Sequence, residues 1–172
     1  HLTKDFSRNI KYLFEAIKYP SFIIIILIPL SISIICAAYI PILYDEAFTY
    51  LNFTKKGVLF SMFYYPAPNN HVLFSISTNL FYWLRPLFPV LSIRLPTLIF
   101  HFLFLLTSFA FVRKYWNKNM AVLCTGLTSV LLMNLASAFT ARGYELTLLI
   151  FIIGLHFTFK ILKDPVSFTP WF

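Results

Sequence analysis

Residues 21–43 read SFIIIILIPLSISIICAAYIPIL, a run of 23 residues without a charged side chain. As an α-helix this run would be about 34 Å long at 1.5 Å per residue, which is enough to cross a lipid bilayer. The whole chain of 172 residues is 59% hydrophobic and 12% charged, whereas soluble domains carry about 25% charged residues. The sequence therefore predicts an integral membrane protein and excludes a water-soluble globule.

Three more uncharged runs follow, and we expect each of them to cross the membrane. They cover about residues 94–112, 120–141 and 146–162. A further apolar stretch, His71–Leu84, has 14 residues and would reach only about 21 Å before Arg85 and Pro86. This stretch either crosses the membrane or lies along its surface.

The basic residues distinguish these two topologies, because cytoplasmic loops of membrane proteins are enriched in lysine and arginine. The basic groups are Lys4, Arg8, Lys11 and Lys18 before the first span, Arg113, Lys114 and Lys118 after the second, and Lys160 and Lys163 at the end of the fourth. If His71–Leu84 crossed the membrane, the last two groups would face away from the cytoplasm. We therefore predict that His71–Leu84 lies in the interface and that the N-terminus is cytoplasmic.

These choices predict an all-α fold, a polytopic transmembrane helical bundle with amphipathic juxtamembrane helices in an outer loop over residues 44–93. We expect one membrane module over residues 1–172, with spans at about 21–43, 94–112, 120–141 and 146–162 and without internal repeats. The net charge of +8 comes from groups that flank the spans. It therefore indicates a membrane lipid partner and not a nucleic acid.

The few acidic residues suggest where chemistry could occur: on the outer face, the side of the membrane away from the cytoplasm. Of the six in the chain, Asp45, Glu46 and Glu145 are expected there. Asp45 and Glu46 would open a short juxtamembrane helix over residues 45–56 that ends at Gly57. Two interpretations of this acidic pair remain open: it caps the helix and interacts with the helix dipole, or it takes part in chemistry.

A turn-rich segment with two prolines and two asparagines, Tyr64–His71, leads into the interfacial stretch. His71 at its end could lie near Asp45, where an imidazole can donate to a phosphate or orient a hydroxyl. The alternative is an ordinary loop whose tyrosines lie at the level of the lipid headgroups.

Two arginines, Arg94 and Arg142, stand at outer ends of expected spans, and Tyr144 and Glu145 follow the second. A guanidinium matches phosphate oxygens with paired donors and stays charged, so these arginines could hold an anionic headgroup. The alternative is that they reach toward the interface or pair with Glu46 and Glu145.

The sequence also argues against several classes of site. His101 and His156 lie inside expected spans, where we interpret them as structural groups with hydrogen-bond partners. CxxC and HExxH spacings are absent, as are a glycine-rich phosphate loop and a GxSxG motif. Chemistry on a soluble nucleotide is therefore not expected.

Four short motifs occur in a fixed order after the first span: Tyr44–Glu46, Pro66–His71, Ser92–Pro96 and Ala141–Glu145. In this order they resemble the N-terminal part of a C-type (GT-C) membrane glycosyltransferase that uses a polyprenyl-phosphate-linked sugar. Protein O-mannosyltransferases and the aminoarabinose transferase of lipid A belong to this group. Its members usually run to several hundred residues, so we expect this chain to be part of a longer polypeptide in a bacterial inner membrane.

The resemblance implies that Asp45 is the catalytic base and that Glu46 supports it by orienting the loop or by accepting from Arg94. Transfer of the sugar from its lipid phosphate to an extracytoplasmic acceptor would invert the anomeric carbon. The residues implied in substrate binding are Asn70, His71, Arg94, Arg142, Tyr144 and Glu145.

Relatives often carry an aspartate where this chain has Arg142–Glu145, which leaves open whether Glu145 replaces it and whether a divalent cation takes part. No other cofactor is expected. The implied partners are membrane lipid and the polyprenyl-phosphate-sugar donor. The alternative function is a noncatalytic membrane subunit of this architecture, packed against partner membrane subunits in a larger complex.

Overall fold

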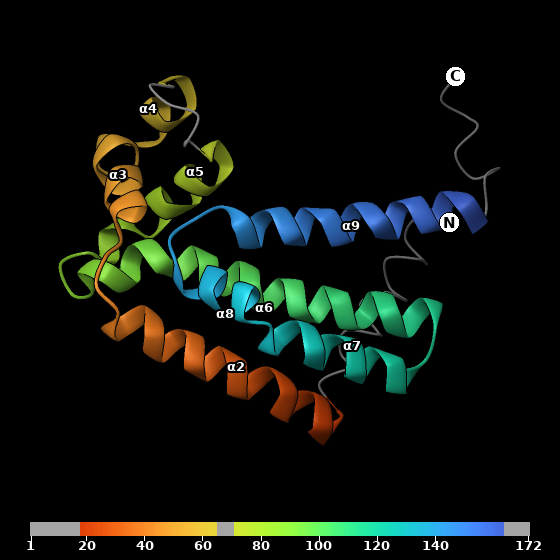
Figure 1. Ribbon diagram of the computed structural model, residues 1–172. Coiled ribbons are helices and arrows are strands. Elements are labelled where there is room, and N and C mark those ends of the chain that lie inside the picture. Colours follow the sequence, from red (N-terminus) through yellow and green to blue (C-terminus); the bar gives the residue numbers. More distant parts are fainter. Residues whose placement is uncertain (1–17, 65–70, 164–172) are drawn as a thin grey trace, which may run out of the picture.

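The computed structural model describes residues 18–64 and 71–163, and every regular element in these residues is a helix. Three helices are long and apolar enough to cross a membrane: α2 (Pro20–Tyr39), α6 (Pro89–Tyr115) and α9, whose apolar part is Tyr144–Leu162. They lie alongside one another in Figure 1. The expected spans at 21–43, 94–112 and 146–162 thus correspond to helices, and α6 begins five residues before the expected boundary because Pro89 opens it.

The helix directions follow from contacts near the C-terminal end of α6. Lys118 and Arg113 lie over the ring of Tyr19, which directly precedes α2, at 3.7 and 5.1 Å from its centroid. Tyr115 donates to the backbone oxygen of His156, which lies late in α9 (Tyr144–Lys163), at 3.2 Å. Helix α2 is therefore antiparallel to α6, and α9 runs in the same direction as α6.

The return path between α6 and α9 is made by two helices, α7 (Lys118–Val130) and α8 (Leu132–Phe139), which are bent by 65° relative to each other. A single helix was expected over residues 120–141. Thr128 and Ser129 donate to backbone oxygens of their own helix just before the bend, a pattern that weakens and bends helices. Across the bend, Asn134 Nδ2 donates to the oxygen of Thr128 at 3.0 Å and satisfies this α7 carbonyl.

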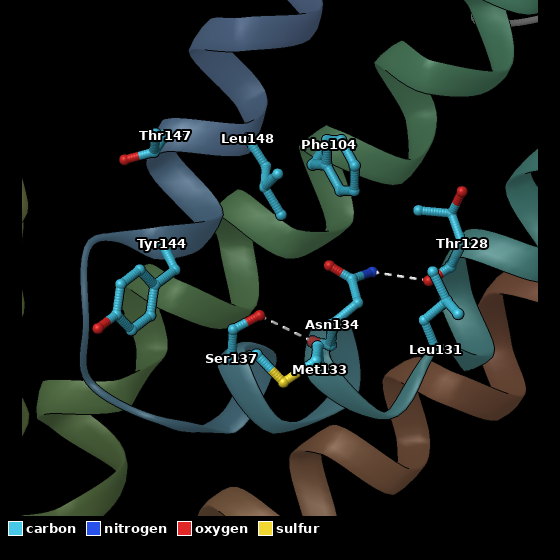
Figure 2. A pocket seen from close by; sticks show the side chains of 9 residues that line it. All are labelled: Phe104, Thr128, Leu131, Met133, Asn134, Ser137, Tyr144, Thr147 and Leu148. Carbon is cyan, nitrogen blue, oxygen red and sulfur yellow. Dashed lines mark hydrogen bonds between the residues drawn. The ribbon is translucent and has the colours of Figure 1, made fainter.

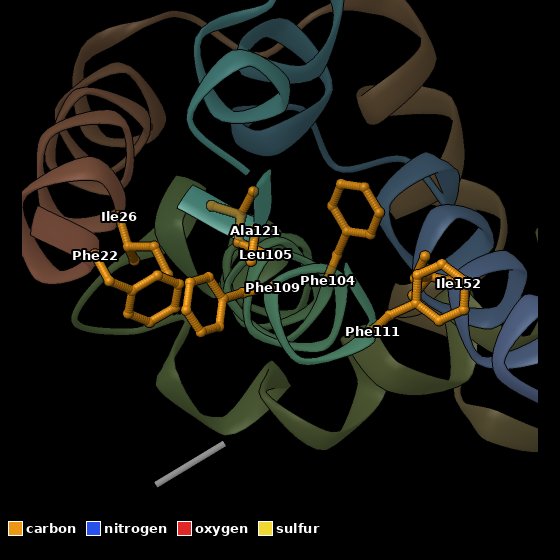
Figure 3. Close-up of a cluster of buried hydrophobic side chains, with 8 residues drawn as sticks. All are labelled: Phe22, Ile26, Phe104, Leu105, Phe109, Phe111, Ala121 and Ile152. Atoms are coloured by element: carbon orange, nitrogen blue, oxygen red, sulfur yellow. The ribbon is translucent and has the colours of Figure 1, made fainter. Parts of the chain in front are cut away.

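The apolar core lies where α2, α7 and α9 pack around α6. Phe22 of α2 contacts Phe109 of α6 with ring centroids 4.1 Å apart, and Ala121 of α7 is fully buried. Figure 3 shows these side chains together with Phe111 and Ile152, which join α6 to α9. The core fixes the long helices relative to one another.

Short elements gather at the end of the bundle where α2 ends and α6 begins, at the left of Figure 1. They are α3 (Tyr44–Asn52), η1 (Thr54–Lys56), α4 (Val58–Phe63), α5 (Val72–Leu80) and η2 (Tyr82–Leu84). Helix α5 has nine residues, about 14 Å, which is too short to cross a bilayer. A hydrogen bond between Thr54 and Thr78 (2.7 Å) and one from Asn79 to Ser61 (3.3 Å) hold the short elements together.

Candidate functional site

The two neighbouring acids Asp45 and Glu46 have opposite environments although both lie in the first turn of α3. The Glu46 side chain is fully buried, whereas 53% of the Asp45 side chain is exposed. Consecutive positions on a helix point about 100° apart, so one acid faces the protein while the other faces outward. The two carboxylates therefore have separate roles.

Glu46 is held by a buried ion pair with Arg94, one turn inside α6. Arg94 Nε and Nη2 donate to the two carboxylate oxygens of Glu46 at 2.8 and 2.6 Å. The remaining N–H groups donate to backbone oxygens after or near the end of α2: Ala37 (2.9 Å), Ile40 (2.7 Å) and Pro41 (3.0 Å). All five guanidinium N–H groups thus have an acceptor, so Arg94 has no donor left for a substrate phosphate.

Glu46 also joins two loops through backbone amides. It accepts from the N–H of Leu43 at 2.9 Å, which caps the start of α3, and from the N–H of Ala141 at 2.6 Å. Burial alone would raise the pKa of Glu46, but the bonds from Arg94, Leu43 and Ala141 together hold this pKa below its usual 4.5. The carboxylate is charged, and it fixes the position of Ala141 next to α3.

The hydrogen bond between Ala141 and Glu46 also brings Asp45 and Arg142 together, because Asp45 precedes Glu46 in the sequence and Arg142 follows Ala141. Arg142 Nη1 lies 3.3 Å from Asp45 Oδ2, and Nη2 donates to the hydroxyl of Tyr144 at 3.2 Å. Nη1 is buried and, among the residues that the structure describes, has no hydrogen-bond acceptor in a suitable geometry. Since buried N–H groups in proteins are nearly always paired, this donor marks a place where an acceptor from a ligand would fit.

His71 belongs to the same group of side chains as Asp45, Arg142 and Tyr144. Its ring meets the ring of Tyr144 edge-on, with centroids 5.7 Å apart, and it packs directly against Gly143. Partial burial, together with the positive charge of Arg142, lowers the pKa of His71 below 6.5. His71 is therefore neutral at pH 7 and can donate or accept one hydrogen bond through each ring nitrogen.

Glu145, the third acid expected on the outer face, is fully buried. One carboxylate oxygen lies 3.0 Å from Nδ1 of His101 on α6, and the other accepts from the hydroxyl of Ser137 on α8. Glu145 therefore links α9, α6 and α8 and is not exposed at the surface. The sequence did not point to Ser137, although polar side chains within spans usually face the bundle.

The structure thus brings Asp45, His71, Arg142 and Tyr144 together, with Glu46 and Arg94 buried behind them. Asn70 lies outside the described residues. Within residues 18–64 and 71–163, no three histidine, cysteine or acidic side chains gather as a metal site would require.

Comparison of this chain with protein-family models, with curated protein sequences and with solved structures found no match. The resemblance to C-type glycosyltransferases therefore rests on the four motifs, whose described residues converge in space.

Proposed function

We propose that this chain is the catalytic part of an integral-membrane glycosyltransferase that moves a sugar from a polyprenyl-phosphate donor to an acceptor hydroxyl. One observation carries the proposal: Asp45 is half exposed 3.3 Å from Arg142, whose buried Nη1 makes no hydrogen bond within residues 18–64 and 71–163. Glycosyl transfer from a lipid phosphate needs both parts, a carboxylate to take a proton and a cation to neutralise the leaving phosphate.

In the proposed reaction, Asp45 removes the proton from the acceptor hydroxyl as its oxygen bonds to the anomeric carbon. The bond between that carbon and the phosphate oxygen breaks, and the electron pair leaves with the lipid phosphate. Attack and departure on opposite faces of the sugar invert the anomeric carbon. Arg142 stabilises the charge on the phosphate, and neutral His71 donates to it or orients the acceptor.

Glu46 and Arg94 act in this scheme as positioning residues. The bond from Ala141 to Glu46 holds the Arg142 loop against the helix that carries Asp45. Reactions between positioned groups gain from such pre-organisation, because little rotational or translational freedom is lost at the reacting step.

We further propose that this end of the bundle faces away from the cytoplasm, in a bacterial inner membrane. The opposite end carries a cluster of basic side chains, as cytoplasmic faces do. The described members of this cluster are Lys18, Arg113, Lys114, Lys118 and Lys160.

The test is sugar transfer by membranes that contain the full protein, assayed with a panel of radiolabelled polyprenyl-phosphate hexoses and pentoses. Asp45→Asn should lower kcat by about 100-fold to 10,000-fold, the usual contribution of a general base, with normal expression and folding. Full activity in Asp45→Asn would overturn the mechanism. Inactive wild-type protein that co-purifies with a membrane partner covering Asp45 would favour the noncatalytic subunit.

Two arginines provide a matched pair for the phosphate-binding role. Arg142→Gln should raise KM and lower kcat, because it removes the cation beside Asp45. Arg85→Gln removes an exposed arginine from the same end of the bundle, where Arg85 contacts Tyr82 and not Asp45, and should change both constants much less than Arg142→Gln does. Equal effects of the two substitutions would contradict a specific role for Arg142.

A further inference from the structure

A cavity of about 430 Å³ lies beside the bend between α7 and α8, against the first turns of α9. This volume is within the range of about 300–1,000 Å³ that is typical of small-molecule sites. Its walls carry no charged side chain and are mostly apolar (Figure 2). The lining residues used below are Leu131, Met133, Asn134, Tyr144 and Thr147.

The described lining of the cavity contains one buried polar atom without a partner. Asn134 is only 7% exposed, and its Oδ1 makes no hydrogen bond to any residue that the structure describes. Its Nδ2 donates to the oxygen of Thr128, which sets the orientation of the amide, because a flipped amide would bring two oxygens together. In Figure 2 the free oxygen points away from Thr128 and into the space between α8 and α9. A buried carbonyl oxygen without a donor is unfavourable, so this position fits a ligand that donates one hydrogen bond.

The cavity can be entered from the side of the bundle. Met133 and Leu131 on its rim are 84% and 59% exposed. Both lie beside helices that are long and apolar enough to cross a membrane, so the rim would face lipid. An occupant therefore comes from the bilayer. The uncharged walls favour a neutral molecule with a hydrocarbon body over an anionic headgroup, which would have to be desolvated without a cation to pair with it.

We propose that this cavity binds a neutral membrane lipid alcohol, with its hydrocarbon body among the apolar residues and its hydroxyl donating to Asn134 Oδ1. The hydrocarbon chain of a polyprenyl donor has no hydrogen-bond donor and does not meet this requirement. Tyr144 lines the cavity, and its hydroxyl also accepts a hydrogen bond from Arg142. A bound lipid would therefore contact the candidate site through the side chain of Tyr144.

The test is photolabelling of the full protein in phosphatidylcholine nanodiscs, without any sugar donor. The probes are a hexadecanol that carries a diazirine near the hydroxyl and the methyl ether of the same molecule, which cannot donate. We expect the alcohol to label α8 and α9 about fivefold more than the ether at equal concentration, as the loss of one buried hydrogen bond implies. Equal labelling by the two probes would overturn the proposal.

Variants of α9 supply the control. Thr147→Trp places a large ring at the edge of the cavity from an exposed position and should abolish the preference for the alcohol. Ile150→Trp adds the same ring at an exposed position of α9 outside the lining and should label as the wild type does. Unchanged labelling of Thr147→Trp would also overturn the proposal. Because labelling needs no turnover, this result is independent of whether Asp45 catalyses sugar transfer.

Discussion

Glu46 and Arg94 form a buried ion pair in which either charge would be isolated if the other were removed. Their side chains are fully buried, and the pair also binds backbone groups at the end of α2, before α3 and before α9. Removal of one partner of a buried ion pair typically costs about 3–5 kcal/mol, because the remaining charge stays desolvated. The pair therefore matters for stability as well as for the position of Asp45.

Arg94→Met should lower the free energy of unfolding by about 3–5 kcal/mol, because it leaves Glu46 charged and buried. Arg94→Lys should restore only part of this loss, since an ammonium group has three donors where five are used. Unfolding in detergent by titration with a denaturing surfactant measures both. Arg85→Met, at an exposed arginine, should change stability by less than about 0.5 kcal/mol. A similar loss in Arg94→Met and Arg85→Met would show that the buried network is not stabilising.

His71 gives stability a pH dependence of defined sign. Its pKa is lowered in the folded protein by burial and by Arg142, so the unfolded chain binds a proton at a higher pH than the folded chain does. Stability should therefore fall as the pH drops below 6.5, with no contribution from His71 above that value. The measurement compares melting temperatures at about pH 7.5 and about pH 5.5 for wild type and His71→Gln, since these values bracket the usual histidine pKa. An unchanged pH dependence in His71→Gln would exclude His71 as its source.

The sequence predicts which residues make up the site more fully than it predicts which of them are buried and which are exposed. Scarce acids and outer arginines identify Asp45, Glu46, Arg94 and Arg142 as candidates, and Arg94 binds Glu46, which is the alternative to its expected role in substrate binding. Which acid is buried depends on how α3 packs, and two adjacent carboxylates give no sequence signal for this. The donor from Ala141 is a backbone amide, which every residue except proline provides, so no sequence pattern marks it.

At the scale of elements, hydropathy predicts where the long helices lie but not where they break. Residues 120–141 are uncharged throughout, yet α7 ends at Val130 and α8 starts at Leu132. The bend depends on hydrogen bonds from Thr128, Ser129 and Asn134 to backbone oxygens, which compete with regular helix geometry. A hydropathy window averages over these side chains and does not register them.

The approach of α5 to the start of α9 depends on a glycine. A Cβ added at Gly143 would lie 2.8 Å from both Cβ and Cγ of His71, closer than such atoms approach in proteins. Gly143→Ala should therefore displace His71, lower stability by about 1–3 kcal/mol as overpacking does, and reduce any transfer activity. Gly154→Ala is the matched control, since a Cβ there meets nothing within 4 Å and should stabilise α9 by about 0.5–1 kcal/mol. Equal melting temperatures and activities for the two variants would contradict the close contact.

At the scale of the whole molecule, the orientation in the membrane can be measured with single cysteines. In a background with Cys36 and Cys124 replaced by alanine, Lys55→Cys and Arg85→Cys lie at the end of the bundle that carries Asp45, and Asn119→Cys lies at the other. A membrane-impermeant maleimide added to intact cells should label the first two and not the third. Labelling of Asn119→Cys alone would place Asp45 in the cytoplasm and remove the proposed access to extracytoplasmic acceptors.

Because the charges of Glu46 and Arg94 cancel each other, the electric field at this end of the molecule is set by the other charged side chains. Once that pair cancels, the acidic and basic side chains left at this end, among the described residues, are four cations and two carboxylates. They are Lys55, Lys56, Arg85 and Arg142 against Asp45 and the buried Glu145. Such a surface attracts anions before any contact forms, so a phosphate-bearing lipid that diffuses in the leaflet would be steered toward Asp45. Capture of that lipid should slow as ionic strength rises.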